Sequence, residues 1–194
     1  MKRLSRATWI VLATGLALVA VVALVGPRRA ALLVKCGAER TWRGGERDLD
    51  GVRVQLPPSW CDSARGNPRG TSELRTVRVP RSRSSQSALA IVRRVDFDLS
   101  REAVESAMPG LEFETPEYGH WLAADLADVD LGGRPGYEIR FERSLPGTGG
   151  ADEVAADFMV PELHVWVQCA PMSAEELAQC RAIAASAQPS ARAN

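Results

Sequence analysis

The residues with the best-defined chemistry are the cysteines, of which the chain has four. They are Cys36, Cys61, Cys169 and Cys180. An even number in an exported domain is typical of disulfides, and four cysteines allow three pairings. Proximity along the chain favours Cys36–Cys61 and Cys169–Cys180, and free buried thiols in a cytosolic domain are the alternative. Because neither pair has Cys-x-x-Cys spacing, a zinc site is not expected.

Six arginines between residues 65 and 83 form the main charged cluster. They are Arg65, Arg69, Arg75, Arg78, Arg81 and Arg83. Residues 28–95 carry 15 basic against 6 acidic side chains and residues 96–194 carry 6 against 18, so that the formal net charge of the whole chain is zero. The cluster could bind an anionic surface or an acidic partner. The alternative is that the two halves pair inside the fold, and no nucleic-acid partner is expected.

The remaining candidates for catalysis or metal binding lack a complete motif. Asp125, Asp128 and Asp130 alternate like calcium ligands, but the twelfth position counted from Asp128 is Ile139 instead of the required Glu. His120 and His164 stand alone, and no Gly-x-Ser-x-Gly sequence supplies a nucleophile. We therefore expect no catalytic residue, no metal and no cofactor.

The N-terminus has the pattern of a membrane-targeting segment. Residues 1–8 are a basic flank, and residues 9–25 contain no charge. Twenty residues of helix cover about 30 Å, the thickness of a hydrocarbon core. The pattern predicts a transmembrane signal-anchor over 9–26, with cleavage after Ala23 as the alternative. The positive charges on the two sides of this segment are nearly equal and do not fix its orientation. The cysteines favour an extracytoplasmic domain, held by a single pass in the inner membrane.

Downstream, the patterning predicts a juxtamembrane linker over 27–50, one globular domain over 51–187 and a loose tail over 188–194. Strands are expected over 51–56, 74–79, 88–93, 122–131, 136–143, 154–160 and 163–169. Helices are expected over 100–108 and from the capping box of Ser173 and Glu176 onward. The predicted fold class is α+β: the transmembrane helix, then one largely antiparallel sheet with packed helices, an α/β/α sandwich.

Three short segments resemble the PsbP-like family. Residues 51–60 are similar to its opening strand, proline and tryptophan, and residues 130–137 to its hairpin with a Gly-Arg-Pro turn. The third segment is a strand ending at Cys169 before a closing helix around Cys180. The resemblance implies an α/β/α sandwich and membership of a group consisting mostly of binding or assembly proteins without catalytic residues.

Together these patterns predict a membrane-anchored extracytoplasmic binding or assembly module without catalytic activity. Its expected partners are the membrane, through residues 9–26, and an envelope protein or an anionic surface. One alternative is a cell-envelope hydrolase, which His120 would indicate if it lay in a cleft within hydrogen-bond reach of an acid and a serine. The other is a cytoplasm-facing domain that binds anionic lipid or a polyanion through its arginines.

Overall fold

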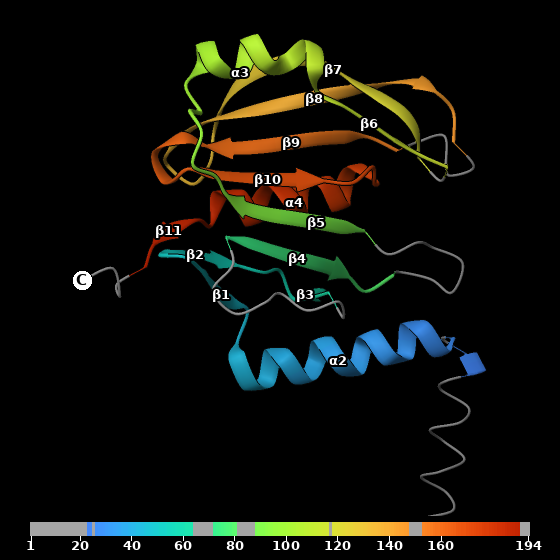
Figure 1. The fold of residues 1–194 in the computed structure, drawn as a ribbon. Helices are drawn as coiled ribbons and strands as arrows, with labels where there is room; N and C mark the ends of the chain where they lie inside the picture. The colour runs from blue at the N-terminus through green and yellow to red at the C-terminus, as the bar shows by residue number, and fades with distance from the viewer. Residues whose placement is uncertain are drawn as a thin grey trace, which may run out of the picture.

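A computed structural model describes residues 23–24, 26–63, 72–80, 88–116, 118–147 and 153–190. The described chain is mostly sheet with three α-helices, α2 (Pro27–Arg43), α3 (Arg101–Ala107) and α4 (Ala174–Ala185). Two short 3-10 helices, η1 (Met108–Gly110) and η2 (Pro161–Leu163), follow α3 and β9 respectively. Figure 1 shows α4 behind the strands β5 and β10, α3 above the strands and α2 below them.

The strands form two antiparallel sheets. In spatial order the eight-stranded sheet contains β3 (Trp60–Asp62), β4 (Glu73–Arg78), β5 (Leu89–Arg94), β10 (Val165–Cys169), β9 (Ala155–Val160), β8 (Pro135–Leu145), β7 (Gly119–Asp130) and β6 (Glu112–Thr115). The three-stranded sheet contains β1 (Glu46–Leu49), β2 (Val52–Gln55) and β11 (Gln188–Pro189).

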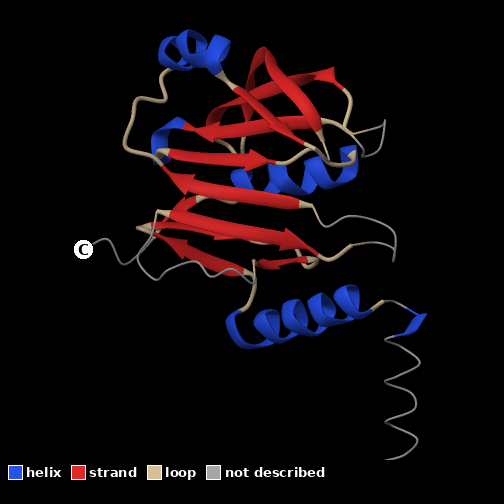
Figure 2. Cartoon of the chain, turned by 45° about the vertical axis from the view of Figure 1, so that its right-hand side comes forward, coloured by secondary structure: helices blue, strands red, loops and turns tan. Residues whose placement is uncertain are grey.

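The two faces of the large sheet bury different cores, because successive side chains of a strand point to opposite faces. On one face, Val165 and Val167 of β10 pack with Ile183 of α4 and with the small sheet. On the other face, Val104 of α3 packs with Ile139 of β8 over one end of the sheet. Figure 2 shows α3 at the upper end of the strands and α4 behind the middle of the sheet.

The β7–β8 hairpin and α4 form where their local signals predict. Gly132 and Gly133 have φ of 68° and 83°, as a two-residue hairpin turn requires. Ser173 and Glu176 form the predicted capping box, in which the Glu176 amide is 3.4 Å from the Ser173 hydroxyl and the Ser173 amide is 3.1 Å from the Glu176 carboxylate. Both predictions are confirmed.

Residues 27–50, expected to be a linker, instead carry α2 and β1. The inner face of α2 is fixed to β3 by the Cys36–Cys61 disulfide, and Arg47 pairs with Glu39 of the helix and with Asp62 of β3. The start of the expected loose tail is also ordered, since β11 pairs with β2. Residues 191–194 lie outside the described residues.

Two parts of the predicted architecture are wrong. Within the described ranges, no helix is both long and apolar enough to span a membrane. This finding corrects our prediction of an N-terminal transmembrane helix over 9–26 and of a single-pass inner-membrane location; residues 9–22 and 25 lie outside the described part of the chain. The prediction of a single sheet between helical layers is also wrong. The strands divide into two sheets, and the smaller sheet packs on the same face of the larger one as α4.

Candidate functional site: a cavity beside a buried carboxyl

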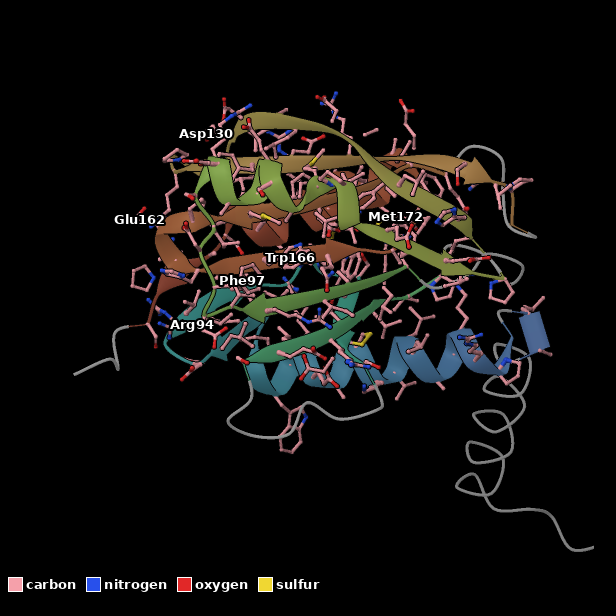
Figure 3. The ribbon with its side chains drawn as sticks, turned by 45° about the horizontal axis from the view of Figure 1, so that its top comes forward. Arg94, Phe97, Asp130, Glu162, Trp166 and Met172 are labelled. Atoms are coloured by element: carbon pink, nitrogen blue, oxygen red, sulfur yellow. A yellow bond between two sulfur atoms is a disulfide. The ribbon has the colours of Figure 1, made fainter. Side chains whose placement is uncertain are left out.

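The face of the large sheet opposite α4 is the more open one. In Figure 1, α4 runs behind β5 and β10, and no described helix crosses in front of them. Alternation places Ile91, Arg93, Trp166 and Gln168 on this open face, where all four side chains are half-buried. Trp166 meets Phe97 edge-on, with ring centroids 5.9 Å apart, and Figure 3 shows the two side chains next to each other.

A cavity of about 240 Å³ lies on this open face, which we call the sheet-face cavity. Strand β5 and the β6–β7 hairpin, which lie on opposite sides of β10 and β9 in the strand order, both line it. The side chains that matter most for its chemistry are Leu89, Ile91, Phe113, Thr115, Tyr118, Asp157 and Gln168. The cavity is therefore mainly apolar, with a carboxyl and an amide as its principal polar groups.

Asp157 of β9 is the unusual residue of this site. Only 5% of it is exposed. Its Oδ1 accepts a hydrogen bond from the Cys169 amide at 3.1 Å and its Oδ2 accepts one from the Trp166 indole at 2.9 Å. Burial raises the pKa of Asp157 to about 7, against the opposing effects of these two donors, Gln168 and Arg93. Near neutral pH the carboxyl therefore exists in both protonation states.

Sequence reasoning missed Asp157, although a signal was present. The acid stands in the middle of the otherwise apolar segment 155–160, which is buried throughout. An ionisable residue in a strand buried on both faces needs hydrogen-bond partners or a raised pKa. The isolated acid in an apolar strand was therefore the available clue.

A line of polar groups runs from Asp157 across the open face to β4. Gln168 bonds to Asp157 and accepts a hydrogen bond from Arg93 at 2.5 Å, and Arg93 in turn donates to Glu73 at 2.8 Å. Hydrogen bonds from Arg75 and then Arg93 lower the pKa of Glu73. The charge of Arg93 is thus balanced by Glu73, while Asp157 meets that charge only through a neutral amide.

His120 forms a hydrogen-bonded line with a serine and an acid. Its Nδ1 is 2.8 Å from the Ser144 hydroxyl, and its Nε2 is 3.2 Å from a carboxylate oxygen of Glu112. The order serine, histidine, acid is that of a serine hydrolase triad, but the two ring nitrogens are exchanged, because in the triad Nε2 faces the serine and Nδ1 faces the acid. However, Ser144 is exposed and the Glu112 side chain is 61% exposed, on the face of β6–β8 turned away from Phe113 and the sheet-face cavity. The hydrogen bonds of His120 meet one condition for a hydrolase. The second condition, a position in a cleft, is not met, because Ser144 and Glu112 are exposed.

Of the six clustered arginines, the structure describes Arg75 and Arg78. They point to opposite faces of β4, because they are three positions apart. Arg78 is buried and bonds to Glu176 at 2.5 Å and Gln179 at 3.1 Å, whereas Arg75 is exposed and pairs with Glu73. The other four arginines, at positions 65, 69, 81 and 83, lie outside the described residues.

Both predicted cysteine pairs are confirmed as disulfides. The Cα atoms are 5.0 Å apart in Cys36–Cys61 and 6.5 Å apart in Cys169–Cys180, which joins β10 to α4. Among the described residues, no group of three or more His, Cys, Asp or Glu side chains is arranged to hold a metal ion. Asp128 pairs instead with Arg101.

Comparison with known proteins adds no further constraint. No model of a protein family matches the chain. No curated protein is detectably similar to it. The function must therefore be inferred from the chemistry of the site, since a fold alone does not determine function.

Proposed function

We propose that this protein is a non-catalytic binding module whose ligand occupies the sheet-face cavity. One observation carries the proposal: Asp157, almost fully buried and with a pKa raised to about 7, lines an apolar cavity. Desolvating a carboxyl is unfavourable, and such groups are concentrated at functional sites. A mainly apolar cavity with a few convergent polar groups is also the usual form of a small-ligand site.

The surroundings of Asp157 favour binding over catalysis. Its hydrogen-bond partners are an indole, an amide side chain and a backbone amide, none of which is a nucleophile or a general base. The resemblance to the PsbP-like family points to the same class of protein. We also infer that the domain matures in an oxidising compartment, since two disulfides persist where thiols are not kept reduced.

A fragment screen by two-dimensional ¹H–¹⁵N NMR tests this proposal. Ligands should shift the amide signals of residues around the sheet-face cavity, and Ala170→Phe, which places a ring at the cavity wall, should abolish those shifts. Ala178→Phe on the exposed side of α4 is the matched control and should leave them unchanged. If no fragment of a ring-containing library perturbs these signals, the cavity is not a binding site and the proposal fails.

The line of Ser144, His120 and Glu112 supports a second candidate, a serine hydrolase. A base oriented by an acid beside a serine is the signature of an activated nucleophile. Incubation with a fluorophosphonate decides between the candidates, because this reagent modifies activated serines covalently. Labelling that disappears in Ser144→Ala would establish the hydrolase. An intact mass unchanged by the reagent, in folded protein, would eliminate it.

A further inference from the structure

The volume of the sheet-face cavity limits what can enter it. An engineered apolar cavity of about 150 Å³ holds benzene, and drug-sized ligands occupy roughly 300–1,000 Å³. At about 240 Å³ the cavity lies between these sizes. It therefore suits one aromatic ring or a fused pair of small rings, rather than an extended chain.

The walls of the cavity define the chemistry of that ring. Phe113 and Tyr118 offer aromatic surfaces from the β6–β7 hairpin, and Leu89 and Ile91 offer aliphatic surface from β5. Aromatic pairs attract each other beyond the effect of burying their area. The site therefore favours a flat apolar ligand over a polar one.

The polar wall of the cavity selects a hydrogen-bond donor. An ionised carboxylate has about four acceptor positions. Asp157 uses three of them, for Cys169, Trp166 and Gln168. A cation is disfavoured, because a mainly apolar cavity would strip its charge of water. A neutral N–H or O–H group is consequently the best complement to Asp157.

We propose that the cavity recognises a neutral aromatic ring carrying one N–H or O–H donor, which is placed on the carboxyl of Asp157. This inference rests on the proposed binding function and deepens it. The ring could belong to a free aromatic compound, or to a tryptophan or tyrosine side chain of a partner protein, since both present the same chemistry.

Recognition of a donor by Asp157 couples binding to pH. A donor bonds more strongly to the ionised carboxylate than to the protonated acid, so the ligand lowers the pKa of Asp157 from about 7. By linkage, affinity must then rise as the pH rises through that value. If only the ionised form binds, the affinity increases about tenfold between pH 6 and pH 8.

Indole and indene provide a matched pair of probes, because they have nearly the same shape and only indole has an N–H. Dissociation constants are measured for both by NMR titration of the full chain at pH 6, 7 and 8. The inference predicts that indole binds up to about tenfold more tightly at pH 8 than at pH 6. Indene should show no increase, and Asp157→Asn should bind indole without this pH dependence.

The outcomes separate this inference from the proposed function. If neither indole nor indene binds, the inference is overturned, and the fragment screen decides whether the proposed binding function also fails. Equal binding of indole and indene at every pH overturns the donor inference and leaves the binding module standing. The wild-type comparison suffices for this decision even if Asp157→Asn fails to fold, which the dispersion of its NMR spectrum reports.

A second arm identifies the source of the ring. A blocked tripeptide with a central tryptophan is titrated beside free indole. Tighter binding of the peptide, with the same rise between pH 6 and pH 8, supports a partner's side chain as the ligand. Binding of indole alone, with that rise, supports a free aromatic compound. Loss of the pH dependence with both probes contradicts the inference.

Discussion

Replacing Asp157 with asparagine should change how the free energy of unfolding depends on pH. The pKa of this carboxyl is about 7 in the folded protein, against about 3.9 for an ordinary aspartate. Between these two values the folded protein holds a proton that the unfolded chain has released. The unfolded chain then binds fewer protons, so the contribution of Asp157 to stability is complete at low pH and is lost as the pH rises to about 7.

The size of the effect follows from the difference between the two pKa values. About three pKa units at roughly 1.4 kcal/mol each amount to about 4 kcal/mol between pH 4 and pH 8. Asparagine cannot ionise. However, its NH₂ group takes the place of an oxygen that accepts a hydrogen bond from the Cys169 amide or the Trp166 indole. The loss of this hydrogen bond lowers the free energy of unfolding by about 1–3 kcal/mol. The variant should therefore be less stable than the wild type at pH 4 and more stable at pH 8.

Urea unfolding of both proteins at several pH values measures this difference. Subtracting the stability–pH curve of one protein from that of the other removes the contributions of other carboxyls. Glu73 is one of them, and its lowered pKa makes its contribution to stability rise with pH. Asp96→Asn, which removes an exposed carboxyl, controls for the change in net charge. A difference between Asp157→Asn and wild type that stays constant from pH 4 to pH 8 would refute the assignment of a desolvated carboxyl to Asp157.

Four further predictions concern stability and use urea unfolding at fixed pH as the measurement. Removing the disulfide between β10 and α4 in a double cysteine-to-alanine variant should cost about 3 kcal/mol, because its partners are 11 residues apart in sequence. Arg78→Ala should cost about 3–5 kcal/mol by leaving a mostly buried glutamate without its ion pair. Arg75→Ala, at a half-exposed pair, should cost less than about 1 kcal/mol. Gly132→Ala should destabilise clearly more than Gly133→Ala: both have positive φ, but a Cβ at Gly132 would collide with the carbonyl oxygen of Ala185 whereas Gly133 has open space.

Local signals predicted the elements that depend on neighbouring residues. The Gly132–Gly133 hairpin and the capping box of Ser173 formed as expected, since turn and cap chemistry act over a few positions. The disulfides were also correct, because both join segments that are close in sequence.

Features that depend on distant contacts were missed. The helix over 27–43 carries a clear amphipathic pattern that was overlooked, and its place against the sheet is fixed by Cys61 and Arg47, which lie further along the chain. The line through His120 joins three strands, so its partners depend on the register of β6, β7 and β8. Asp157 is buried by the combination of four elements around the sheet-face cavity. Patterns along one segment reveal an amphipathic helix or an isolated acid in an apolar strand, but not the distant contacts that these residues make.

The most direct test of the central claim is the measurement of intermolecular nuclear Overhauser effects between indole and the full protein at pH 8. The binding account predicts contacts from the indole ring to the Ile91 methyl groups and to the ring of Phe113, both of which line the sheet-face cavity. Contacts elsewhere on the protein, for example only around His120, or no contacts at an indole concentration that saturates the shifts, would contradict it.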